Sequence, residues 1–250
     1  FVCHRCGETR SSSERCFHCT SWNLKALGIG IERIFHDLAW ELPTTPIFRI
    51  DSDTTGTQKQ ALNEATKWLE TPGGVLVGTE MALPFLKPTE NVVVASVDSL
   101  FSVPDFRINE KIFHILLTLR SLAKKTFLVQ TRNPEQRVLA LALEGDVDVF
   151  YEHEIQERER FDYPPFHTLI KLSIRGSKNT VEKASNHVTE IFREYKPIVY
   201  PSFVSRINRA HVAHVLLSVP RGQWVDKTLL GKLRRLPPSI TIDVEPQSTL

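Results

Sequence analysis

The sequence predicts an α/β protein with two folded parts, and three observations support this prediction. Strand-length apolar runs alternate with helix-length segments from residue 24 to residue 131, which is the pattern of a parallel sheet with right-handed crossovers. Pro164 and Pro165 then end a long helical stretch, because proline cannot continue a helix and favours an extended residue before it. The segments that follow alternate as strand, helix, strand, strand, helix and strand, which is the order of a split βαβ sandwich.

The first part contains strands with the composition of a buried sheet. Its apolar runs VLV and VVVASV are continuous, as expected for strands that are covered on both faces. The run PIFRIDSDTT ends in Asp and Thr residues that can cap the next helix. We expect a short strand and an amphipathic helix within residues 24–43, strands within 46–55, 73–79, 91–98 and 126–131, helices at 57–70 and 108–124, and helical material over 135–160.

The second part follows the Pro-Pro pair and has its own set of alternating segments. Its expected strands cover residues 167–175, 198–207, 211–219 and 240–244, and its expected helices cover 179–195 and 224–236.

Four cysteines form two Cys-x-x-Cys pairs near the start of the chain, at Cys3, Cys6, Cys16 and Cys19. Four thiolates complete a tetrahedral zinc site and leave no open position for chemistry, so we expect a structural zinc. By spacing alone, the two pairs can close on one ion. No other cysteine occurs in the chain, which favours a metal site in a reducing, cytoplasmic compartment over a disulfide framework.

The charge of the chain is distributed unevenly. Residues 161–250 hold 13 Lys and Arg against 7 Asp and Glu, whereas residues 1–160 hold 18 against 22. The basic second part is therefore the better candidate for an anionic partner such as DNA. An equally good alternative is a set of dispersed solvating charges. The candidate DNA contacts are Arg206, Arg209, Lys232, Arg234 and Arg235. No run of eighteen apolar residues is present, so no membrane partner is expected.

Several stretches together resemble the C-terminal half of the PriA family, the primosomal protein N′ helicases of superfamily 2. They are the two cysteine pairs, GIGIER, RIDSDTT, VLVGTEM, VDSLFSVPDFRINEK, YPPF and IDVEP, in this order. The resemblance implies a partial zinc-binding segment over residues 1–21 and a RecA-like helicase second lobe over 22–160. It implies a PriA-like C-terminal domain over 161–250.

The resemblance also implies a different zinc pairing and a set of partners. In PriA-like proteins four cysteine pairs bind two zinc ions in a nested pattern, so each pair of this chain would share zinc with a pair upstream of Phe1. The implied partners are forked and single-stranded DNA, the single-stranded DNA-binding protein and other primosome proteins. The nucleotide-side motifs would be represented by Gly78, Thr79, Asp105 and Arg107.

The chain departs from the family where ATP hydrolysis would need it most. Active members carry a segment Q-x-x-GR-x-GR whose arginines reach the ATP phosphates, whereas residues 116–131 read LLTLRSLAKKTFLVQT and contain no glycine. No G-x-x-x-x-G-K-[ST] motif occurs in the chain either. We therefore expect no catalytic residue here, and bound ATP with Mg²⁺ is doubtful. The basic residues Arg120, Lys124 and Lys125 suit the end of a helix instead.

Three functions compete at this point. The first is a replication restart protein that binds forked DNA and supports primosome assembly without unwinding it. The second is an active ATP-dependent 3′-5′ helicase that tolerates the altered motifs. The third is a zinc-ribbon nucleic-acid-binding module of an unrelated enzyme.

Overall fold

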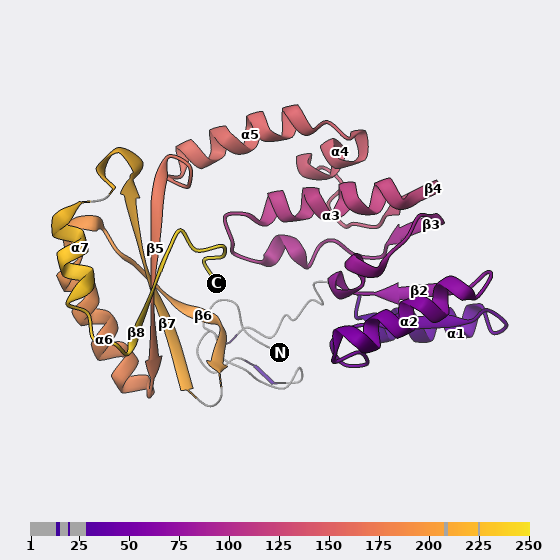
Figure 1. Ribbon diagram of the computed structural model, residues 1–250, viewed down its shortest axis with the longest axis horizontal. Coiled ribbons are helices and arrows are strands. Elements are labelled where there is room, and N and C mark those ends of the chain that lie inside the picture. Colours follow the sequence, from indigo (N-terminus) through magenta and orange to yellow (C-terminus); the bar gives the residue numbers. More distant parts are fainter. Residues whose placement is uncertain (1–13, 16–19, 21–28, 208–209, 225) are drawn as a thin grey trace. The chain divides into compact units, whose positions relative to one another are not determined.

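The computed structural model describes residues 14–15, 20, 29–207, 210–224 and 226–250, without the side chains of residues 203–207. By its internal contacts the chain divides into two compact units (Figure 1). The central unit contains the described residues 29–103 together with Glu110–Asp146. The C-terminal unit contains the described residues 14, 15 and 20, Pro104–Asn109 and the described residues from Val147 to Leu250.

The central unit contains the parallel strands predicted after residue 46, whereas the short strand expected before the first helix falls mainly on residues 24–28, outside the described residues. β1 (Ile47–Ile50) pairs with β2 (Val75–Gly78), and β3 (Thr89–Val94) pairs with β4 (Ala123–Val129), both in parallel. The described strands thus form two parallel pairs rather than one continuous sheet. The helices are α1 (Ile31–Glu41), α2 (Gln58–Glu70), α3 (Ile108–Leu122), whose first two residues belong to the C-terminal unit, and α4 (Arg137–Glu144).

Local sequence signals explain where two of these helices begin and end. Thr57 caps α2 by accepting a hydrogen bond from the Gln60 amide at 3.3 Å, and the Gln60 side chain accepts one from the Thr57 amide at 3.0 Å. These two bonds satisfy amides that have no partner inside the helix. α4 ends at Gly145, whose φ of 80° is left-handed and favours glycine.

The boundary of α3 differs from its prediction. We expected a helix over residues 108–124, but α3 ends at Leu122 and β4 begins at the next residue, Ala123. Ala123 already pairs with Thr89 of β3. The strand therefore begins directly after the last residue of the helix.

The C-terminal unit confirms the predicted order of alternating strands and helices. Its four-stranded sheet has the order β6-β7-β5-β8, and every neighbouring pair is antiparallel. α6 and α7 lie on the same face of this sheet (Figure 1). The elements are α5 (Val147–Arg160), β5 (His167–Gly176), α6 (Lys178–Ile191), β6 (Ile198–Ile207), β7 (Ala210–Pro220), α7 (Lys227–Arg234) and β8 (Ile240–Val244). α5, which we expected to follow the first part, groups with this unit.

The hydrophobic core of the C-terminal unit lies between the sheet and its two helices. Alternate residues of the central strands point into it, as the two-residue period of a strand requires. Fully buried members include Ile170, Leu172, Val188, Phe192, Val215, Leu217 and Leu229. Both helices begin at a capping residue, since Ser177 accepts from the Thr180 amide and Asp226 accepts from the amides of Thr228 and Leu229.

The opposite face of this sheet carries polar residues that hold the last residues of the chain. His214 of β7 shares a hydrogen bond of 2.9 Å with the Ser173 hydroxyl of β5. Lys171 donates to the carbonyl oxygens of Ser248 at 2.7 Å and Leu250 at 3.0 Å. His214 is buried beside the ring of Tyr200, with 6% of it exposed.

We expect His214 to make the stability of the C-terminal unit depend on pH. Burial lowers the pKa of His214, and the nearby positive charge of Lys171 lowers it further. In the unfolded chain the His214 side chain is therefore protonated as the pH falls through about 6.5, whereas in the folded unit it is protonated only at lower pH. Stability should be full above about pH 6.5 and fall below it, by at most about 1.4 kcal/mol per pH unit for one proton. Urea unfolding between pH 7.5 and 5.5 measures this slope.

The matched variants are His214→Gln and His187→Gln. His187 is exposed on α6, so its replacement should leave the slope unchanged, whereas His214→Gln should flatten it. An equal pH slope in the His214→Gln protein would rule out this role of His214.

Candidate nucleic-acid interface

The motif RIDSDTT forms a hydrogen-bonded loop at the carboxyl end of β1. Its centre is Asp51, which is only 2% exposed. The Asp51 carboxylate accepts from the Arg49 Nε at 2.5 Å and from the amides of Asp53 at 2.9 Å and Thr54 at 2.8 Å. Burial alone would raise the pKa of Asp51, but the hydrogen bonds from Arg49, Thr54 and Asp53 lower it. Asp51 is therefore an ionised anchor of the loop.

The motif VGTEM lies beside this loop at the carboxyl end of β2. A Cβ atom on Gly78 would lie 2.6 Å from the Ala82 Cβ and 3.3 Å from the Ile50 carbonyl oxygen, so only glycine fits. The Thr79 amide donates to the same Ile50 carbonyl at 3.1 Å. Gly78 and Thr79 are both exposed at this edge. Ligands of open α/β sheets bind at the carboxyl ends of the strands, so these residues sit where a ligand of the central unit is expected.

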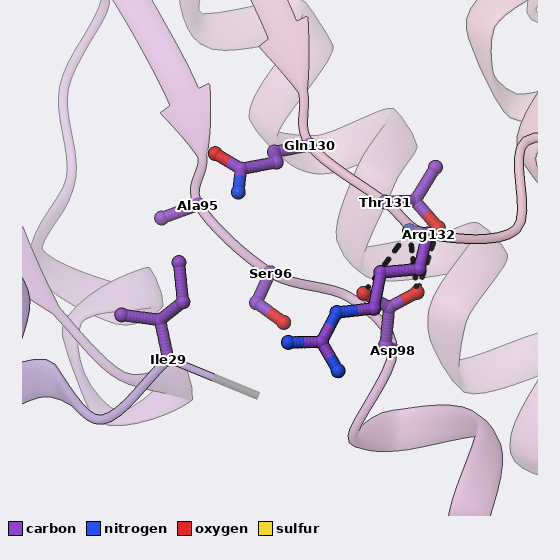
Figure 2. A pocket seen from close by; sticks show the side chains of 7 residues that line it. All are labelled: Ile29, Ala95, Ser96, Asp98, Gln130, Thr131 and Arg132. Carbon is purple, nitrogen blue, oxygen red and sulfur yellow. Dashed lines mark hydrogen bonds between the residues drawn. The ribbon is translucent and has the colours of Figure 1, made fainter. Parts of the chain in front are cut away.

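A small open pocket of about 50 Å³ lies at the carboxyl ends of β3 and β4 (Figure 2). Asp98 joins the segments after β3 and β4, because its carboxylate accepts hydrogen bonds from the Thr131 hydroxyl at 2.7 Å and from the Arg132 amide at 3.1 Å. The polar side chains of Ser96, Gln130 and Arg132 also line it. Gln130 and Arg132 were missed by the sequence analysis, although polar residues directly after a buried parallel strand are a signal for this edge.

Two of the three cations near the end of α3 have other contacts within the central unit. The Arg120 Nη1 lies 2.9 Å from the position that a Cβ atom on Gly145 would take, so its guanidinium packs against the end of α4. Lys125 forms an ion pair with Glu90. Lys124 is exposed on β4. No connecting residue separates α3 from β4.

Asp105 and Arg107 lie in the C-terminal unit. The Asp105 carboxylate accepts from the Arg107 amide at 2.9 Å, from the Thr249 amide at 3.0 Å and from the Ser248 hydroxyl. Burial and the Asp105 charge raise the pKa of Tyr200 to about 12, so its hydroxyl stays protonated and donates to the Thr249 carbonyl at 2.5 Å. Asp105 thus holds the terminal residues of the chain.

The structure describes only part of the expected basic face. Arg234 and Arg235 are exposed at the end of α7. Lys232 forms an ion pair with Glu194 at 2.6 Å, and this hydrogen bond lowers the pKa of Glu194. Arg209 and the side chain of Arg206 lie outside the described residues. Of the candidate cations that are described, only two offer an uncompensated charge.

The zinc prediction lies outside the part of the chain that the structure describes, because Cys3, Cys6, Cys16 and Cys19 are not among the described residues. The described residues contain no cluster of three or more His, Cys, Asp or Glu side chains that could hold a metal ion. Within the same residues, no helix combines the length and apolar character needed to cross a membrane.

Comparison with known proteins gives a consistent result. The chain is 30% identical to replication restart protein PriA of Bacillus subtilis over 73% of its length, 26% identical to that of Thermotoga maritima over 98%, and 27% identical to that of Synechocystis over 98%. These matches cover 23%, 34% and 32% of the respective relatives. The chain therefore spans about a quarter to a third of the curated relatives it matches. No family model matches the chain.

The role of Asp51 as an anchor can be tested by local stability. Asp51→Ala removes the buried carboxylate that pairs with Arg49 and leaves its part-buried guanidinium only the exposed Glu32 carboxylate at 4.0 Å. Removing one partner of a buried ion pair typically costs about 3 kcal/mol. Asp53→Ala changes an exposed neighbour in the same loop and should cost less than about 0.5 kcal/mol. Hydrogen exchange of the β1 and β2 amides measures both effects. Equal protection in the two variants would contradict the role of Asp51.

Proposed function

Since this chain belongs to the PriA family of replication restart proteins, we propose that it binds forked or single-stranded DNA and supports primosome assembly without unwinding DNA itself. The observation that carries the second half of this proposal is the direct junction of α3 and β4. In active members, arginines of a glycine-rich segment at this place reach the ATP phosphates. Here the backbone passes from helix to strand without the loop that would carry them.

The chemistry of phosphoryl transfer explains why this loss matters. Protein groups contribute mainly by positioning and by placing cations over the developing charge. An arginine finger is worth about 10³ to 10⁵ in rate, and a neighbouring lysine cannot reproduce its bidentate contacts. Arg120 and Lys125 are also engaged elsewhere. We therefore propose that the central unit is a RecA-like lobe retained as a scaffold, with Gly78 and Thr79 as remnants of its nucleotide-side motif.

An active ATP-dependent helicase is the second candidate. It is favoured by the exposed position of Gly78 and Thr79 at the carboxyl edge of β1 and β2, where ligands of α/β sheets bind. The partners that we propose are DNA, the single-stranded DNA-binding protein and other primosome proteins.

DNA binding by the full-length protein should depend steeply on salt and little on base sequence, because phosphate contacts carry no sequence information. Replacing both Arg234 and Arg235 with Ala should lower the salt slope of fork binding by about 2, one for each lost phosphate contact. Lys232→Ala is the matched control, since Lys232 is already paired with Glu194. Fluorescence anisotropy between 50 and 200 mM salt gives the slopes. An unchanged salt slope in the double variant would show that the end of α7 does not contact DNA.

The nested zinc arrangement can be tested by metal analysis of the full-length protein. If each cysteine pair shares its zinc with an upstream pair, replacing all four cysteines with Ser should release two zinc ions per molecule. Replacing only Cys3 and Cys6 should release one. If the four cysteines instead hold one ion among themselves, both variants should lose a single zinc.

A further inference from the structure

We propose that the turn after α5 is a stacking platform for an unpaired base of single-stranded DNA, with Phe161 as its base-contacting residue and Arg160 as its cation. This inference rests on the proposed DNA-binding function and assigns it a location in the C-terminal unit.

Phe161 lies on the surface, next to an aromatic cluster that is partly buried. It follows the last residue of α5, Arg160, and 56% of it is exposed. Tyr163, two residues further on, packs its ring 5.2 Å from the ring of Phe106 and is partly buried. The chain therefore has an aromatic cluster beneath the turn, and Phe161 remains at its outer edge, 6.2 Å from the ring of Tyr163.

An arginine side chain lies against the exposed Phe161 ring. The Arg160 guanidinium carbon lies 5.4 Å from the centre of the Phe161 ring, within the range of a cation–π contact. Beneath it, the guanidinium of Arg158 lies 5.6 Å from the ring of Phe106 and pairs with Glu154. Arg158 is thus part of the packing, and Arg160 is the cation on the exposed side.

Hydrogen bonds on both sides hold the turn in place. The Phe161 amide donates to the Glu157 carbonyl at 3.0 Å, and the Tyr163 amide donates to the Arg158 carbonyl at 2.8 Å. The Ser218 hydroxyl of β7 donates to the Asp162 carbonyl at 3.1 Å. The platform is therefore fixed before a ligand arrives, which reduces the entropy cost of binding.

His167 also contacts the residues that hold this turn. Its Nε2 lies 3.1 Å from an Asp162 carboxylate oxygen, and its Nδ1 lies 2.9 Å from the Ser218 hydroxyl oxygen. The three residues have the composition of a Ser-His-Asp triad, but Ser218 donates its proton to a backbone carbonyl and is not activated as a nucleophile. Their role is to hold the turn.

The chemistry of this surface favours single-stranded DNA over a duplex. An aromatic face stacks on any unpaired base and needs no hydrogen-bond readout, and arginine adds to such stacking. A paired base inside a duplex presents only its edge to a protein. Glu157 and Glu159 are exposed nearby and would repel phosphates, so stacking should contribute more to binding here than charge does.

The test compares ordinary single-stranded oligonucleotides with oligonucleotides whose bases are replaced by abasic sites, using the full-length protein. Phe161→Ala should weaken binding of the ordinary oligonucleotide roughly 5- to 150-fold, the range found for one lost base–aromatic contact. It should also shrink the preference for ordinary over abasic DNA by the same factor. Phe161→Trp should retain both, which separates loss of the platform from loss of folding.

Tyr151→Ala is the matched control. Tyr151 lies on the same helix, is 51% exposed and contacts the ring of Phe150, so its removal should leave both quantities unchanged. If Phe161→Ala binds ordinary and abasic DNA as the unsubstituted protein does, the platform is ruled out while DNA binding stands. If the unsubstituted protein binds neither single-stranded nor forked DNA, the proposed function itself fails.

Discussion

The direct passage of α3 into β4 constrains what the central unit can do. Ala123 follows the last helical residue and pairs with Thr89, and the ladder resumes at Thr126 after an irregularity, so no separate loop lies between helix and strand. A flexible, glycine-rich segment carrying arginines needs such a loop, because its side chains must reach phosphates outside the sheet. The same junction brings β3 and β4 into the parallel pair whose carboxyl ends form the pocket around Asp98.

The residues that carry the family resemblance have structural explanations of their own. Asp51 anchors the loop after β1, and Gly78 is required by the close approach of Ala82 and Ile50. Asp105 holds the last residues of the chain through Ser248 and Thr249. These roles maintain the fold whether or not ATP is hydrolysed. They therefore give these motifs a structural reason to be present that does not depend on catalysis.

Sequence reasoning predicted the elements well where periodicity was strong. The strands from residue 46 onward and the order of the C-terminal unit are confirmed, because continuous apolar runs and Pro-Pro or glycine breaks are local signals. The end of α3 was misplaced by two residues, since Ala123 and Lys124 suit a helix and only the pairing of this segment with β3, which begins at Ala123, selects a strand. Periodicity also gave no indication that α5 groups with the C-terminal unit, because such grouping depends on contacts distant in sequence.

The candidate site was harder to predict than the fold. Net charge suggested a basic face, but the pairing of Lys232 with Glu194 can be seen only in three dimensions. Phe161 and Arg160 are adjacent in the sequence, yet their exposure depends on how Tyr163 and Phe106 pack beneath them. Composition reports which charges and rings exist, and the fold decides which of them reach the surface.

The most direct test of binding without unwinding is strand separation by the full-length protein on forked DNA with ATP and Mg²⁺. We predict a stable complex with the fork, no displaced strand, and ATP hydrolysis at least about 10³-fold below that of an active helicase, as expected for a lost arginine finger. Robust unwinding that disappears when Arg120, Lys124 and Lys125 are replaced with Ala would contradict this prediction. It would mean that these cations do the work of the missing arginines.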